Sequence, residues 1–193
     1  MRHYRKIKKA VFPIAGFGTR FLPITKSVPK EMLPIINKPL ISWALEEASS
    51  SGIEEFIFVV GGNTALLKDY FSKWPALKQK LKKDNQTTLL REINKIEKFL
   101  PKIKFVNQKF PLGLGHAIWC ARKIIGDDFF AVILPDDLIL AKNPCLKQMI
   151  EAHKRVGGNL VAVEKVPSDQ VNRYGILDPA SSKGSLIKVK RLV

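Results

Sequence analysis

The sequence has few cysteines and histidines and no long apolar segment. Its two cysteines, Cys120 and Cys145, and its three histidines stand far apart in 193 residues. Neither a disulfide framework nor a Cys/His metal site is therefore expected, and two reduced thiols are typical of the cytoplasm, where we place the protein. The apolar runs are too short for a transmembrane helix, and the run after the basic start is too short for a secretory signal.

Acidic residues are also scarce, since 17 Asp and Glu stand against 33 Lys and Arg, a net charge of +16. The excess lies in residues 1–10 (+5), 68–109 (+8, from 12 basic and 4 acidic residues) and 183–193 (+4). In the middle segment the lysines follow apparent helices without interleaved aromatic residues. We favour a solvated lysine face there over an anion- or RNA-binding surface, which stays open as the alternative.

Enough apolar residues are present for a packed core, with 46% hydrophobic and 9% aromatic content. A chain of this length buries roughly 70% of its unfolded surface, so one domain needs no cross-links or structural metal. Val-, Ile- and Phe-rich runs alternate with segments of helical periodicity. Strands are expected at 9–14, 55–60, 103–107, 129–134 and 160–166, with weaker ones near 176 and at 186–193. Helices are expected at 39–51, 64–74, 75–100, 115–125 and 144–156.

This alternation predicts a doubly wound α/β sheet in one domain spanning 1–193. The five stronger strands are apolar at nearly every position, as expected for strands buried on both faces. Residues 75–100 are interpreted as a helical insertion with a break at Asn85. In such sheets ligands bind at the carboxyl ends of the strands, which directs attention to the loops 15–34, 107–116 and 135–138.

The loop after the first strand reads "AGFGTRFLPITKSVPKEMLP". Gly16 and Gly18 lack a Cβ where backbone N–H groups could wrap phosphate oxygens, and prolines stiffen the segment. Arg20 adds a planar fork of donors and Lys30 a mobile charge, so the loop suits several anionic oxygens. It is not a Rossmann fingerprint, because Phe21 occupies the third glycine position, and it lacks the G-K-[ST] of a Walker A loop.

The stretch "AGFGTRFLPITKSVPKEMLPIINKPLI" resembles the signature of bacterial UTP–glucose-1-phosphate uridylyltransferases, which belong to the sugar-nucleotide pyrophosphorylases. The resemblance continues through "NQKFPLGLGHAIWCA", "FAVILPDDLI" and "RYGILDP", from about residue 9 to the end. It implies a Rossmann-like, doubly wound mixed sheet of the nucleotide-sugar transferase type. It also implies transfer of a uridylyl group from UTP to glucose 1-phosphate, giving UDP-glucose and pyrophosphate.

The resemblance assigns the phosphate side of the site to the first loop. Arg20 would contact the departing pyrophosphate, and Lys30 would lie near the transferred α-phosphate. Glu31 would lie beside the nucleoside. The backbone that cradles the phosphates would come from Ala15, Gly16, Gly18 and Thr19.

The same resemblance places uracil against Gln108, whose amide both donates and accepts hydrogen bonds. Gly113 and Gly115 would let the backbone close over the base, and Gly175 would approach the sugar. We give His116 a structural role, because a sugar phosphate attacks through an oxygen that is already ionised and needs no general base.

The segment "ILPDD" ends the fourth strand with two carboxylates. Asp136 is a hard oxygen ligand where Mg²⁺ would bridge phosphates, and Mg²⁺ commonly uses one or two protein carboxylates. Asp137 would support it. A pair of this kind after a strand is otherwise often a helix cap, and the neighbouring phosphate loop decides for the metal at Asp136.

Two other functions stay open: a thymidylyltransferase of the same fold, and a non-catalytic nucleotide- or RNA-binding module. In the resembling family the final strand, "IKVKRLV", leads into a Glu-Lys-Pro motif that contacts the sugar phosphate. We therefore expect this chain to be incomplete at its C-terminus, to hold mainly the nucleotide-binding half, and to turn over poorly alone. Homo-oligomerisation is left open.

Overall fold

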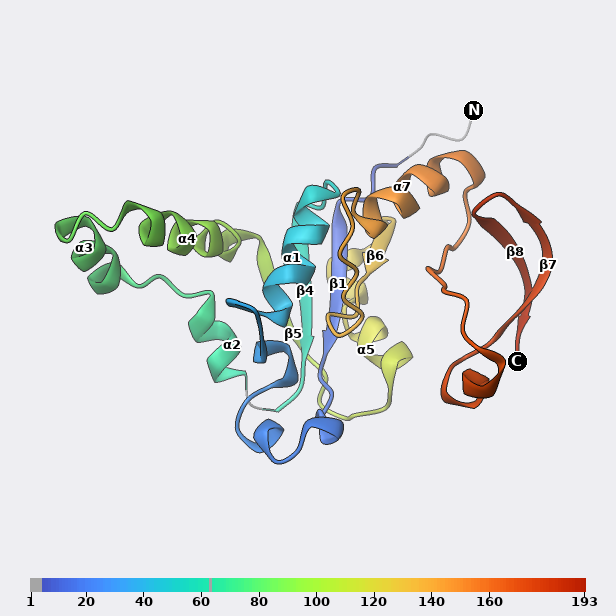
Figure 1. Ribbon diagram of the computed structural model, residues 1–193, viewed down its shortest axis with the longest axis horizontal. Coiled ribbons are helices and arrows are strands. Elements are labelled where there is room, and N and C mark those ends of the chain that lie inside the picture. Colours follow the sequence, from blue (N-terminus) through green and yellow to red (C-terminus); the bar gives the residue numbers. More distant parts are fainter. Residues whose placement is uncertain (1–4, 63) are drawn as a thin grey trace. The chain divides into compact units, whose positions relative to one another are not determined.

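A computed structural model describes residues 5–62 and 64–193 and divides the chain into two compact units, Met1–Asn159 and Leu160–Val193. The first unit contains a four-stranded sheet in the order β5-β4-β1-β6, and each neighbouring pair is parallel (Figure 1). Its strands are β1 (Lys9–Ile14), β4 (Glu55–Val60), β5 (Ile103–Asn107) and β6 (Phe130–Val132). A short antiparallel pair follows β1 and consists of β2 (Pro34–Ile35) and β3 (Lys38–Pro39). The predicted α/β fold with a parallel central sheet is confirmed.

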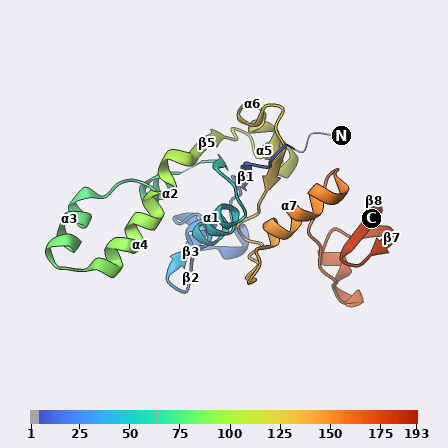
Figure 2. The same cartoon turned by 90° about the horizontal axis from the view of Figure 1, so that it is seen from above.

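Helices cover both faces of this sheet, as Figure 2 shows. Ala10 and Phe12 of β1 point into a core closed by α1 and α7, whereas Val11 points into a second core closed by α5 and α6. The alternation of β1 side chains between two apolar cores is what a doubly wound sheet requires. The helices are α1 (Leu40–Ser50), α2 (Ala65–Tyr70), α5 (Leu114–Cys120), α6 (Arg122–Ile125) and α7 (Cys145–Val156).

Burial on both faces is confirmed for the two central strands only. All of β4 after its first residue is buried, and so are four of the six residues of β1. The edge strands are less buried, and each has one neighbour in the described sheet: β5 holds only half-buried and exposed residues, and β6 has one buried residue between two exposed ones. Apolar composition therefore located these four strands but did not show which of them lie at the sides of the sheet.

The helix predicted at 75–100 is two helices, α3 (Pro75–Lys83) and α4 (Thr87–Glu97), which pack on each other. Asn85 separates them with φ of 52°, a left-handed conformation that asparagine tolerates well, as the sequence predicted. The helix predicted at 64–74 ends earlier, at Tyr70, and the one predicted at 115–125 is interrupted at Ala121.

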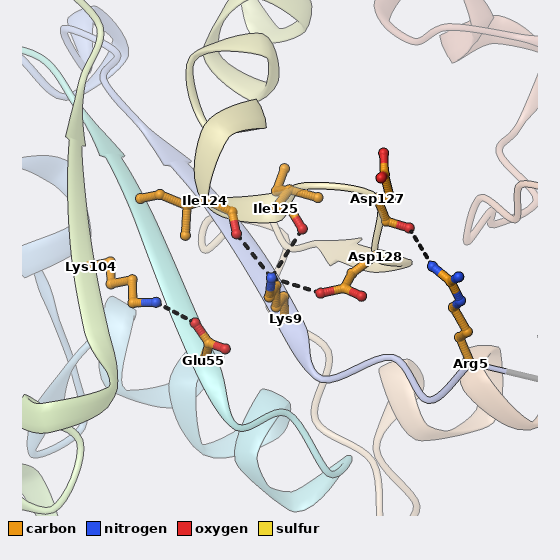
Figure 3. Close-up of polar contacts among 8 residues, drawn as sticks. All are labelled: Arg5, Lys9, Glu55, Lys104, Ile124, Ile125, Asp127 and Asp128. Atoms are coloured by element: carbon orange, nitrogen blue, oxygen red, sulfur yellow. Dashed lines mark hydrogen bonds and ion pairs between the residues drawn. The ribbon is translucent and has the colours of Figure 1, made fainter.

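Lys9 fixes the amino end of β1 to the end of α6, as Figure 3 shows. Its ammonium group donates to the carbonyl oxygens of Ile124 at 2.9 Å and Ile125 at 3.0 Å and lies 2.8 Å from the Asp128 carboxylate. A cation at these carbonyls satisfies acceptors that a helix C-terminus leaves unpaired. The hydrogen bond from Lys9, with its charge, lowers the pKa of Asp128.

The second unit holds an antiparallel hairpin of β7 (Leu177–Lys183) and β8 (Leu186–Leu192). The weaker strands predicted near 176 and at 186–193 correspond to this hairpin. The strand predicted at 160–166 is wrong for this structure, in which the segment has no regular secondary structure and Val161 is 74% exposed. Strand propensity is expressed only when a neighbouring strand supplies hydrogen bonds and packing, and this segment pairs with no described strand.

Candidate functional site

Three predicted loops leave the sheet at the carboxyl ends of its strands. Ala15 follows β1, Gln108 follows β5, and Asp136 lies four residues beyond β6. Because the strands are parallel, these loops all belong to one edge of the sheet. These carboxyl ends lie at the opposite end of the strands from Lys9, which contacts α6 at the amino end of β1.

The loop after β1 is folded into three short 3₁₀ turns, Thr19–Phe21, Ile24–Lys26 and Lys30–Met32. Gly18 begins the first turn with φ of 64°, and a Cβ there would lie 3.0 Å from a methyl carbon of Thr25. The Thr25 hydroxyl donates to the Gly18 carbonyl at 2.8 Å and closes the loop on itself. Gly18 is therefore needed by the loop itself, whereas a Cβ on Gly16 would meet nothing within 4 Å. Gly16 accordingly leaves open space that a phosphate could enter.

The ends of β1 and β4 also approach each other closely. A Cβ built on Gly61, directly after β4, would lie 3.0 Å from the carbonyl oxygen of Ala15. No L side chain fits at that distance without moving the backbone, so Gly61 helps to set the start of the phosphate loop. Sequence reasoning missed this residue. The one available signal was its position directly after a buried strand.

Lys30 and Asp136 are 106 residues apart and meet in an ion pair of 2.7 Å between Nζ and Oδ2. The Arg20 guanidinium lies 3.7 Å from the same oxygen, with 83% of its side chain exposed. Partial burial on its own would raise the pKa of Asp136, but the hydrogen bond from Lys30 and the charges of Lys30 and Arg20 lower it overall. The side chains of Lys30 and Arg20 thus meet the ionised carboxylate of Asp136 at the carboxyl end of the sheet. Both cations could bind further anionic oxygens there.

Glu31 is buried beneath this cluster, with 2% of the residue exposed. Its Oε1 lies 3.9 Å from the Lys30 ammonium and has no hydrogen-bond partner among the described residues. Burial raises the pKa of Glu31 to about 7, although a backbone hydrogen bond and the charge of Lys30 oppose the rise. The carboxyl group therefore points into the protein.

The residues present fit a magnesium ion that takes most of its ligands from elsewhere. Asp136 offers an ionised carboxylate beside the phosphate loop, and Asp137 follows it. Within residues 5–62 and 64–193, no group of three or more His, Cys, Asp or Glu side chains could enclose a metal. One carboxylate completed by phosphate oxygens and water is how Mg²⁺ is commonly held, so Asp136 is compatible with this use.

Gln108 directly follows β5, at the same carboxyl end of the sheet, and is 7% exposed. Its hydrogen bonds hold it in a fixed position. Its backbone N–H donates to the Val60 carbonyl at 2.7 Å. Its side-chain nitrogen Nε2 lies 3.2 Å from the Gly113 carbonyl oxygen and 2.9 Å from Nδ1 of His116. His116 is on α5, and its contact with Gln108 was not foreseen from the sequence.

The remaining predicted residues are less tightly placed. Thr19 and Gly113 are exposed on loops of the first unit, and Gly115 is exposed in the first turn of α5. Gly175 belongs to the second unit and precedes β7. The lysine-rich hairpin of α3 and α4 contains the ion pairs Lys78–Glu97 and Lys95–Glu92, each at 2.7 Å.

A family model described as "Nucleotidyl transferase" matches residues 9–193. A UTP–glucose-1-phosphate uridylyltransferase of Bacillus subtilis (strain 168) is 44% identical over 189 residues, which are 98% of this chain. The chain spans 64% of the length of that relative. No helix within the described ranges combines the length and apolar character that crossing a membrane requires.

Two solved structures are similar in both sequence and fold. The UTP-bound UGPase from Acinetobacter baumannii has a TM-score of 0.90 and 40% identity, covering 97% of this chain and 67% of that one. A UDP-glucose pyrophosphorylase complexed with UDP-glucose has a TM-score of 0.85 and 40% identity, covering 97% and 69%.

Proposed function

This chain belongs to the nucleotidyl transferase family, and from that premise we propose that it binds UTP and transfers its uridylyl group to glucose 1-phosphate. The observation that carries the proposal is the convergence of Arg20, Lys30 and Asp136 on one point beside a glycine loop. Relatives named for this reaction, and solved structures named as holding UTP or UDP-glucose, support the choice of substrates.

In the proposed reaction a phosphate oxygen of glucose 1-phosphate attacks the α-phosphorus of UTP. The new O–P bond forms as the bond between the α-phosphorus and the bridging oxygen breaks, and pyrophosphate leaves with the electron pair. The attacking oxygen is already ionised, so no side chain has to remove a proton. Transfers of this kind depend on positioning and on neutralising charge in the transition state.

Lys30 and Arg20 supply the fixed positive charge in this proposal. Lys30 is oriented by Asp136 at 2.7 Å and has 16% of its side chain exposed, so it costs little to order when phosphates arrive. Arg20 is far more exposed and is assigned to the pyrophosphate. Residues 15–19 supply backbone N–H groups around the phosphates, with Gly16 leaving room for their approach.

Magnesium held at Asp136 would neutralise phosphate charge and orient the pyrophosphate leaving group. In this proposal Gln108 faces the nucleotide base, the turn that contains Glu31 lies beside the nucleoside, and Gly175 is assigned to the sugar. The free thiols of Cys120 and Cys145 fit a reducing compartment, so we place the protein in the cytoplasm. A thymidylyltransferase and a non-catalytic module are not favoured, because the relatives reported above are named uridylyltransferases.

Calorimetric titration of the purified chain with UTP and Mg²⁺ tests this proposal. Lys30→Ala should weaken UTP binding by about tenfold or more, as expected for the loss of a charge-assisted contact. Lys26→Ala is the matched control, since it removes an exposed lysine from the same loop. Equal UTP affinity in the wild type and Lys30→Ala, with both proteins folded, would refute the assignment of the loop.

A further inference from the structure

The side chain of Gln108 has one orientation that its surroundings allow. Its Nε2 lies 3.2 Å from the Gly113 carbonyl oxygen, which can only accept a hydrogen bond. If the amide were turned over, its own oxygen would face that carbonyl and two acceptors would repel each other. The NH₂ group must therefore point toward Gly113, and its second hydrogen points at Nδ1 of His116, 2.9 Å away.

This orientation determines the state of the His116 ring. Because Nδ1 receives a hydrogen from Gln108, it must carry a lone pair, so the ring is neutral with its proton on Nε2. The Cys120 sulfur lies 3.9 Å from Nε2 and 4.0 Å from Nδ1, one helical turn farther along α5. Sulfur is a weak acceptor and is compatible with a proton at Nε2.

Both amide hydrogens of Gln108 are thus used in hydrogen bonds within the protein, whereas its oxygen Oε1 is left to accept one. No described residue donates to Oε1. Toward a ligand, Gln108 therefore offers an acceptor and no donor.

We propose that His116 is a positioning residue that, together with the Gly113 carbonyl, holds this amide orientation and thereby strengthens the preference for a base that presents an N–H donor. The inference rests on the proposed function, in which Gln108 faces the base. Uracil carries a hydrogen on N3, which an acceptor can bind, whereas N3 of cytosine carries a lone pair that an acceptor repels. Without His116, one of the two acceptors that hold the NH₂ group is lost, so the turned-over amide, which presents NH₂ to the base and accommodates cytosine, is opposed only by the Gly113 carbonyl.

Binding constants for UTP and CTP, measured by calorimetry with Mg²⁺, test the proposal without turnover. His116→Ala should lower the ratio of UTP to CTP affinity by about tenfold, the effect of one net hydrogen bond. His116→Asn should keep most of the preference, because its Oδ1 takes the place of Nδ1 as acceptor. Cys120→Ala is the control, since Cys120 contacts the same ring without touching Gln108, and its ratio should equal that of the wild type.

The ring tautomer is a second measurement that needs no nucleotide. Long-range ¹H–¹⁵N NMR spectra at mildly alkaline pH should show His116 with its proton on Nε2, and a proton on Nδ1 would overturn the proposal. If His116→Ala keeps its UTP preference while Gln108→Ala loses it, the role of His116 is wrong and the proposed function stands. If the wild type does not distinguish UTP from CTP, both the proposed function and the preference attributed to His116 fail.

Discussion

Replacing Glu31 with glutamine should stabilise the protein above about pH 7 and have little effect near pH 4.5. Glu31 is 2% exposed, and burial raises its pKa from 4.5 to about 7. The backbone hydrogen bond and the charge of Lys30 act against this rise, and the charge of Asp136 adds to it. Above its pKa the group is a buried carboxylate with one oxygen that lacks a hydrogen-bond partner among the described residues, which destabilises the fold.

The size of the effect follows from proton linkage. Between pH 4.5 and about 7 the folded protein holds a proton on Glu31 that the unfolded chain has lost, so the free energy of unfolding falls as pH rises through this window. A pKa difference of this size corresponds to about 3 kcal/mol. Glutamine has nearly the same shape and no charge to bury, so Glu31→Gln should remove this dependence and be more stable than the wild type by about that amount above pH 7.

Urea unfolding of the wild type and Glu31→Gln at a series of pH values provides the measurement. The difference between the two curves cancels the titrating groups that do not interact with Glu31. Glu92→Gln is a control of opposite sign, because a hydrogen bond from Lys95 lowers the pKa of Glu92, and its removal should not stabilise the protein at any pH. Parallel curves for the wild type and Glu31→Gln would refute the argument that burial raises the pKa of Glu31.

Three further substitutions test how the sheet edges are built. Lys9→Met should lower the free energy of unfolding, measured in urea, by about 2 kcal/mol, because two carbonyl oxygens lose a charged donor. The control Lys8→Met should lower it much less, because Lys8 forms an exposed ion pair. Gly18→Ala should lower the free energy of unfolding by about 1–3 kcal/mol in the same assay, because φ of Gly18 is positive and Thr25 occupies the space that a Cβ would need. The control Gly16→Ala should change it by less than about 0.5 kcal/mol. Asp136→Asn should weaken magnesium-dependent UTP binding in calorimetry while the protein stays folded, and an unchanged magnesium titration would place the metal elsewhere.

The sequence was sufficient to locate the central strands and the loops that leave them. Continuous apolar runs identified β1 and β4, which are buried on both faces, and the parallel arrangement then placed the loops at one edge. The same composition could not tell that β5 and β6 lie at the sides of the sheet. It also predicted a strand at 160–166, because propensity does not say whether a partner strand is present.

Individual side-chain contacts lay beyond what the sequence could provide. Lys30 and Asp136 were each predicted as site residues, but their pairing depends on how a loop of 3₁₀ turns folds back toward β6. The contact of His116 with Gln108 similarly depends on where α5 begins after Gly113. Glu31 was expected beside the nucleoside, and its burial depends on the third 3₁₀ turn, which no helical periodicity marks.

The most direct test of the proposed nucleotide site is hydrogen exchange of the purified chain with and without UTP and Mg²⁺, followed by mass spectrometry. The site described above predicts that UTP slows exchange in residues 15–34 and 107–116 and leaves the hairpin of α3 and α4 unchanged. Protection confined to the lysine-rich hairpin, or no protection at UTP concentrations that calorimetry finds saturating, would contradict the placement of the nucleotide at the carboxyl edge of the sheet.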